Sequence, residues 1–202
     1  MPVLYIVRHG HCDSNVPGMI QGQTDSPLTD LGIRQAGAIA DRLSSESFAA
    51  IYSSDLSRTR NTAAPIAARH GLQVRHTPLL RECCLGAAQG LTESQFEEQY
   101  PAQCALWRED PIANRPPGAE RFEEVIARCG RFISEISAAH PADEKLVVVG
   151  HIGSICGLVC ATFDLPVRFY LEMHVSNASL SIIEIGKKPV LRMLNDSCHL
   201  TD

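Results

Sequence analysis

Two short runs of apolar residues, far apart in the chain, each end beside a histidine. Residues 3–7 precede Arg8-His9-Gly10, and residues 146–149 precede Gly150-His151. Unbroken apolar runs of this length are typical of strands buried on both faces in a parallel sheet. Parallel strands present their carboxyl ends at one edge of the sheet, where open α/β sheets bind ligands. The pattern therefore predicts that both histidines reach the same ligand-binding edge.

Elsewhere the apolar positions recur mainly with the period of a helix. The stripe is clearest over residues 122–136, where apolar side chains three or four positions apart share one face. Further helices are expected after the N-cap residue Thr29 and over residues 58–70 and 155–163. Further strands are expected at residues 51–54 and in a terminal antiparallel hairpin of residues 179–185 and 190–194. Strands that alternate with helices predict an α/β fold, a three-layer sandwich with a mostly parallel central sheet flanked by helices.

One segment, roughly residues 83–117, breaks this alternation. It contains four prolines, Pro101, Pro111, Pro116 and Pro117, and proline is poorly tolerated inside strands. Thr92 and Gln95 have the spacing of a capping box, which opens a short helix. We therefore expect a small helical cap insertion here. The 202 residues suit a single domain, residues 1–202.

Charge and composition narrow the range of partners. The net charge of −5 argues against nucleic acid or an anionic membrane surface as a partner. No apolar segment approaches the roughly 20 residues of a membrane span, and the chain opens into a strand rather than a signal peptide. A cytoplasmic protein is therefore expected, and a homodimer is compatible with the sequence. The eight cysteines should be reduced there, and their spacing matches no zinc site.

The strand ends carry side chains suited to phosphate. The strand at residues 51–54 leads into a helix with Arg58 in its first turn, so that His9, Arg58 and His151 approach one edge. Arginine and histidine rarely fill a core unpaired. The free backbone N–H groups at a helix start suit a dianionic phosphate. A neutral imidazole can attack phosphorus while a guanidinium holds the phosphate oxygens. These residues therefore predict a phosphate site.

The ordered set of motifs resembles the histidine phosphatase superfamily, also called phosphoglycerate-mutase-like. Besides the residues already named, the resemblance rests on Asn15, on Glu82 before Gly86 and Gly90, and on Pro117-Gly118. It covers nearly the whole chain, and residues 194–200 look like the ending of small bacterial phosphatases in this group. It implies a phosphomonoesterase that acts on a small phosphorylated metabolite through a phosphohistidine intermediate, without metal or other cofactor.

The resemblance also implies roles for individual residues. His9 would be the nucleophile and Glu82 the proton donor, although charge alone does not decide which of the two histidines attacks. The remaining residues would bind the phosphate or the substrate: Arg8, Asn15, Gln21, Arg58, His151 and Ile152. In the cap, Arg108 and Arg115 could meet a second anionic group of the substrate.

The chain departs from the family pattern at two positions near the site. His11 follows the Arg8-His9-Gly10 motif, where relatives often carry Glu or Gln, and it is interpreted as a polar loop residue. His151 is followed by Ile152 rather than Asp, which argues against the branch that takes its proton donor from a His-Asp pair. Cys12 and Cys83 flank proposed catalytic residues, where a redox thiol is less favoured than a small buried side chain.

Three alternative functions are compatible with some of these residues. A phosphoglycerate-type mutase would use the same site but needs longer segments that close over the substrate. A catalytically silent phosphate-binding module would not require His9, Arg58, Glu82 and His151 together. A metal-dependent amidohydrolase-like barrel could use His9 and His11 as ligands, but such barrels need about 250 residues. The hydrolase is favoured.

Overall fold

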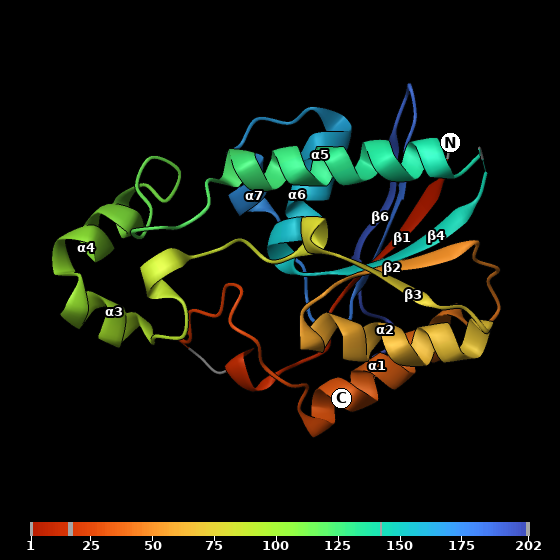
Figure 1. Cartoon of the computed structure of the whole chain (residues 1–202), viewed down its shortest axis with the longest axis horizontal. Coiled ribbons are helices and arrows are strands. Elements are labelled where there is room, and N and C mark those ends of the chain that lie inside the picture. The colour runs from red at the N-terminus through yellow and green to blue at the C-terminus, as the bar shows by residue number, and fades with distance from the viewer. Residues whose placement is uncertain (1, 16–17, 142, 201–202) are drawn as a thin grey trace.

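The computed structural model describes residues 2–15, 18–141 and 143–200, so the outermost residues of the predicted domain lie outside it. Its centre is a six-stranded sheet of order β3-β2-β4-β1-β5-β6 (Figure 1). The four strands that run parallel to one another are β1 (Val3–Arg8), β2 (Ala50–Ser54), β3 (Val74–Thr77) and β4 (Lys145–Gly150). The remaining two form the predicted hairpin, β5 (Leu180–Glu184) and β6 (Val190–Asp196), with β5 antiparallel to β1. The expected mostly parallel sheet is confirmed.

Helices cover both faces of this sheet (Figure 1). One face carries α1 (Asp30–Leu43) and α2 (Ser57–His70). The other carries α5 (Phe122–Ala139), α6 (Ile152–Phe163) and the short α7 (Phe169–Glu172). The predicted three-layer sandwich is therefore confirmed. Within residues 2–15, 18–141 and 143–200, none of the helices combines the length and apolar character that crossing a membrane requires.

The central strand β1 contributes side chains to two hydrophobic cores, one on each face of the sheet. Leu4 and Ile6 of β1 pack with α5 and α6, whereas Tyr5 and Val7 pack with α1 and α2. Side chains along a strand alternate between faces, so a strand buried on both faces needs an unbroken apolar run. The pairing of Arg8 with Gly150 then places the residue after each strand, a histidine in both cases, at the same height.

The start of α1 fixes the loop that follows β1. Thr29 accepts a hydrogen bond from the backbone N–H of Gly32 and caps the helix as predicted. Gly32 lies so close to the backbone of His11 that a Cβ on it would collide with the His11 carbonyl oxygen. Gly10 is similarly constrained, since its Cβ would lie 2.6 Å from the Gly32 carbonyl oxygen. This backbone contact leaves little freedom to the loop that carries His9.

Residues 83–117, which we call the cap, project to one side of the sheet (Figure 1). They contain the 3-10 turn η3 (Gly86–Ala88) and helices α3 (Glu93–Gln99) and α4 (Pro101–Glu109). Two further 3-10 turns, η1 (Asp13–Asn15) and η2 (Pro78–Leu80), lie on the connections around the sheet edge. The capping box of Thr92 and Gln95 opens α3, as the sequence predicts. Phe96 and Cys104 are buried in a small apolar cluster of the cap.

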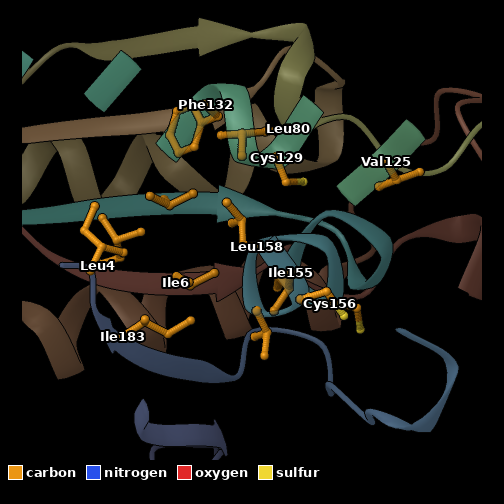
Figure 2. Close-up of a cluster of buried hydrophobic side chains, with 14 of the residues drawn as sticks. Leu4, Ile6, Leu80, Val125, Cys129, Phe132, Ile155, Cys156, Leu158 and Ile183 are labelled. Atoms are coloured by element: carbon orange, nitrogen blue, oxygen red, sulfur yellow. The ribbon is translucent and has the colours of Figure 1, made fainter. Parts of the chain in front are cut away.

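Replacement of Phe132 by alanine should test the larger core. This side chain is 1% exposed and packs with Leu80 and Cys129 between α5 and the sheet (Figure 2). Loss of a buried phenylalanine side chain leaves a cavity, and Phe132→Ala should lower the free energy of unfolding by about 3–5 kcal/mol in urea titrations. Glu135→Ala, at an exposed position of the same helix, should change it by less than about 0.5 kcal/mol. Equal effects of the two substitutions would contradict this packing.

Candidate active site

The carboxyl ends of β1 and β4 bring two imidazole rings together. The backbone N–H of His9 donates to the Gly150 carbonyl at 3.0 Å, which extends the pairing of the two strands. The ring centroids of His9 and His151 are 5.1 Å apart, with an interplanar angle of 58°. Their side chains are almost completely buried, as the relative exposures of 2% for His9 and 0% for His151 show. The predicted juxtaposition of the two histidines is therefore present in the structure.

The hydrogen bond at Nδ1 determines which nitrogen of His9 carries a proton. This atom lies 2.8 Å from the carbonyl oxygen of Gly10. A carbonyl oxygen can only accept, so Nδ1 donates and Nε2 keeps its lone pair. Burial, followed by the positive charges of Arg8 and Arg58, holds the pKa of His9 well below its usual value. His9 is thus a neutral imidazole with a free basic nitrogen.

His151 has the opposite arrangement of donor and acceptor. Its Nδ1 accepts a hydrogen bond of 3.1 Å from Nε of Arg58, which can only donate. The proton of the neutral ring therefore lies on Nε2. This atom is buried and has no hydrogen-bond partner within the described part of the chain. Burial, then the neighbouring His9 and Arg58, hold the pKa of His151 well below its usual value.

Arg58 lies in the first turn of α2 and is fully buried. Its two terminal nitrogens donate to the carbonyls of Thr24 and Gly22, both at 2.8 Å. These acceptors and His151 are all neutral, and the residues that the structure describes form no salt bridge with Arg58. Because neutral partners do not cancel the charge of a buried cation, its positive electrostatic potential favours the binding of an anion nearby.

A second arginine adds to this positive field. Nη1 of Arg8 donates to the Val175 carbonyl at 2.5 Å. Nε of Arg8 is buried and lacks a partner among the described residues. Together with Nε2 of His151, this makes two buried donors at the same edge of the sheet that have no acceptor in the protein. An anion with several oxygens would satisfy them.

Glu82 places a carboxylate at the N-terminus of α6. Its Oε1 accepts from the backbone N–H of Gly153 at 3.0 Å and from that of Cys83 at 2.7 Å. A Cβ on Gly153 would collide with this oxygen and with the hydroxyl of Tyr170, so a side chain there would displace the carboxylate. The hydrogen bonds and the close approach of Gly153 give Glu82 a fixed position.

Two residues near Glu82 were missed by the sequence analysis. Arg128 donates to the Glu82 carbonyl at 3.1 Å and forms a largely buried ion pair with Glu120 at 2.8 Å. Tyr170 is buried, stacks on Phe122 with centroids 4.7 Å apart, and its hydroxyl has no partner in the described chain. Arg128 falls on the buried stripe of α5 between Val125 and Phe132, a signal that could have identified it. No sequence signal marked Tyr170.

These groups surround a cavity of about 420 Å³. Six of the predicted site residues line it, namely Arg8, His9, Asn15, Gln21, Glu82 and Ile152. Arg58 and His151 are not part of the lining, because they are fully buried behind it. Oδ1 of Asn15 accepts from the Cys12 backbone at 2.9 Å, which leaves its amide N–H group to donate to a ligand. Gln21 contacts the Cys12 thiol at 3.2 Å.

The two arginines of the cap that the sequence suggested as substrate contacts lie outside the catalytic cavity. Arg108 and Arg115 do not line the cavity, and Arg108 instead pairs with Glu97 at 2.9 Å on the surface of the cap. His140 is buried, and its ring nitrogens lie 2.9 Å from the Tyr52 hydroxyl and 2.6 Å from the Glu144 carboxylate. Helix α4 has only one buried residue, and the exposed Arg108 lines a smaller pocket that adjoins the cavity. The sequence pattern did not determine this placement.

His11 and Cys83, which lie close in sequence to His9 and Glu82, have environments that explain their presence. Nδ1 of His11 lies 3.0 Å from the Thr29 hydroxyl, in agreement with its interpretation as a polar loop residue. Burial, then the charge of Glu82, raises the pKa of the Cys83 thiol, which therefore stays protonated. Among the described residues, no group of three or more His, Cys, Asp or Glu side chains is arranged to hold a metal ion.

Comparison with known proteins identifies the family. The model of the histidine phosphatase superfamily (branch 1) matches residues 4–197. The glucosyl-3-phosphoglycerate phosphatase of Mycobacterium tuberculosis is 39% identical over 171 residues, which cover 81% of this chain and 76% of that protein. A probable phosphoglycerate mutase of Proteus mirabilis is 32% identical over 208 residues, with 98% and 95% covered.

A solved structure agrees with the same assignment. The native structure of the mycobacterial glucosyl-3-phosphoglycerate phosphatase is 35% identical and has a TM-score of 0.86, with 96% of this chain and 99% of that chain covered. The sequence match and the shared fold both extend over nearly the whole chain. The protein therefore belongs to the histidine phosphatase superfamily.

Proposed function

We propose that this protein is a metal-independent phosphomonoesterase that hydrolyses a small phosphorylated metabolite through a phosphohistidine at Nε2 of His9. The observation that carries the proposal is the opposite polarity of the two histidines. Nδ1 of His9 donates to a carbonyl, whereas Nδ1 of His151 accepts from a guanidinium. His9 therefore offers a lone pair for attack on phosphorus, and His151 offers a proton to a phosphoryl oxygen.

In the first step, Nε2 of His9 forms a bond to phosphorus as the bond to the alcohol oxygen breaks. Negative charge lies on the equatorial phosphoryl oxygens, where Arg8, Arg58 and His151 can donate to them. The amide of Asn15 adds a neutral donor. The negative charge of a bound phosphate favours the protonated form of a carboxyl group beside it, so Glu82 gives its proton to the leaving alkoxide.

In the second step, water attacks the phosphohistidine and the phosphorus–nitrogen bond breaks. Glu82, now a carboxylate, accepts the proton of the attacking water, and His9 returns to its neutral form. Hydrogen bonds from Gly153 and Cys83 keep the carboxylate in one position for both proton transfers. The reaction releases phosphate and an alcohol, and no cofactor is consumed.

The size of the site and the length of the cap favour a phosphatase with a small substrate. A cavity of about 420 Å³ lies within the usual range of small-molecule sites. A mutase must exclude water while it returns the phosphoryl group to the same bound molecule. The cap helices α3 and α4 have only 7 and 9 residues, which is short for a segment that must close over the substrate.

The cytoplasmic location and the homodimer remain predictions.

The proton positions can be tested by NMR. In a spectrum that correlates ring protons with ring nitrogens, His9 should show a protonated Nδ1 and His151 a protonated Nε2 at neutral pH. Both pKa values are lowered by burial, so both rings should stay neutral as the pH falls below 6.5, the usual value for histidine. The same tautomer in both rings, or titration of either near 6.5, would contradict the assignment.

Alanine substitutions should separate the two histidines. His9→Ala should abolish turnover of p-nitrophenyl phosphate and the acid-labile, base-stable phosphoryl label, with chelator present throughout. His151→Ala should keep the label but lower kcat by about 10²–10³-fold, because it removes one donor to the developing charge. His76→Ala is the matched control at an exposed position and should leave activity unchanged. Full activity in His9→Ala would exclude the proposed intermediate.

Glu82→Gln should separate proton transfer from phosphate binding. General acid catalysis contributes about 10²–10⁴-fold, so kcat for an alkyl phosphate should fall by that factor while inorganic phosphate binds as before. The loss should be smaller for p-nitrophenyl phosphate, whose leaving group needs little protonation. Glu98→Gln, at an exposed position of the cap, should have no effect. A small and equal loss with both leaving groups would assign the proton transfer to another residue.

A further inference from the structure

A second pocket adjoins the catalytic cavity beneath the cap. It has a volume of about 290 Å³, and we call it the cap pocket. Four of its lining residues, Ile20, Trp107, Phe122 and Leu171, also line the catalytic cavity. The two spaces therefore meet along a shared apolar wall. A substrate with its phosphate at His9 could extend across this wall into the cap pocket.

We propose that the cap pocket is an apolar subsite for the leaving group, and that the substrates are phosphate monoesters of hydrophobic alcohols. This inference rests on the proposed phosphatase function and specifies its substrate class. The shared wall consists only of apolar and aromatic side chains, and Phe96 adds a fully buried ring next to it. Such surfaces favour alkyl or aryl groups over sugars and carboxylates.

The packing of the aromatic residues makes this subsite preformed. Trp107 meets Phe96 edge to face, with centroids 5.8 Å apart and an interplanar angle of 89°. Phe122 stacks on Tyr170, which is buried. Leu171 is 45% exposed and lines both cavities. A hydrophobic leaving group would cover Leu171 without requiring the aromatic side chains to reorganise.

The distribution of charge argues against a second anionic group on the substrate. Among the described residues, the only cationic side chain that lines the catalytic cavity is Arg8, which the phosphate would engage. At the cap pocket, Arg108 already pairs with Glu97 at 2.9 Å, and Glu93 adds a negative charge to the lining. A substrate carboxylate, as in 3-phosphoglycerate or phosphoserine, would find no unpaired cation there and would lose its hydration.

A series of n-alkyl phosphates from methyl to octyl tests the inference. Full burial of one methylene group is worth about a fourfold change in affinity, so kcat/KM should rise by up to that factor per carbon until the pocket is filled. It should exceed the kcat/KM for 3-phosphoglycerate and phosphoserine. A flat series, or a preference for either carboxylate-bearing substrate, would overturn the inference and leave the phosphatase proposal intact.

Substitutions of the lining residues should show that the dependence of kcat/KM on chain length arises in the cap pocket. Trp107→Ala should flatten the dependence of kcat/KM on chain length. Leu171→Asn offers a second test at a partly exposed position, where the fold should tolerate a polar side chain. Leu106→Ala is the matched control: it lies beside Trp107 on α4, is 44% exposed and lines neither space. An unchanged slope in both Trp107→Ala and Leu171→Asn would overturn the assignment.

Binding gives a readout that does not depend on turnover. Trp107 is the only tryptophan of the chain, so tryptophan fluorescence reports on the wall that this pocket shares with the catalytic cavity. Non-hydrolysable n-alkyl phosphonates should shift its emission, and their Kd should fall with chain length by the same factor per carbon. If these ligands bind in this way but no phosphomonoester is cleaved, the subsite holds and the phosphatase proposal fails. A Kd that does not change with the length of the alkyl chain would overturn the proposed subsite.

Discussion

The hydrogen bond from Arg58 to His151 is the interaction on which the rest of the site depends. It places a permanent donor against Nδ1 of His151 and so directs the proton of that ring to Nε2. The same guanidinium is held by the backbone carbonyls of Gly22 and Thr24 rather than by a carboxylate. Its charge is therefore available to an incoming anion. A carboxylate partner would have stabilised Arg58 but reduced the field that a phosphate experiences.

The fold provides this arrangement through the register of two buried strands. Because β1 and β4 pair with Arg8 opposite Gly150, His9 and His151 leave the sheet side by side. Helix α2 begins at the same edge and supplies Arg58, while α6 begins there and supplies the backbone N–H of Gly153 to Glu82. Burial lowers the pKa of both histidines and keeps them neutral. The same burial that stabilises the core therefore keeps His9 in the neutral form that the proposed attack on phosphorus requires.

Patterning predicted the sheet, the flanking helices and the gathering of His9, Arg58 and His151, since periodicity and strand order determine these features. It could not decide which histidine attacks, because both follow similar strands and only the hydrogen bonds of their rings differ. Arg128 and Tyr170 were missed since their contacts with the Glu82 region join segments far apart in the chain. The position of Arg108 could not be predicted for a related reason: its charge was visible in the sequence, but its pairing with Glu97 and its place at the cap pocket rather than at the catalytic cavity were not.

The two ends of a substrate are thus recognised by different parts of the molecule. In the proposed reaction, side chains at the sheet edge bind the phosphate, and their positions follow from strand register and burial. Apolar side chains from the cap and α7 form the proposed subsite for the leaving group, and their positions follow from the packing around Trp107 and Tyr170. Changes in the cap can therefore alter which alcohol is accepted without moving His9, Arg58 or His151. Membership of the family predicts the reaction at phosphorus, whereas the choice of substrate depends on the cap.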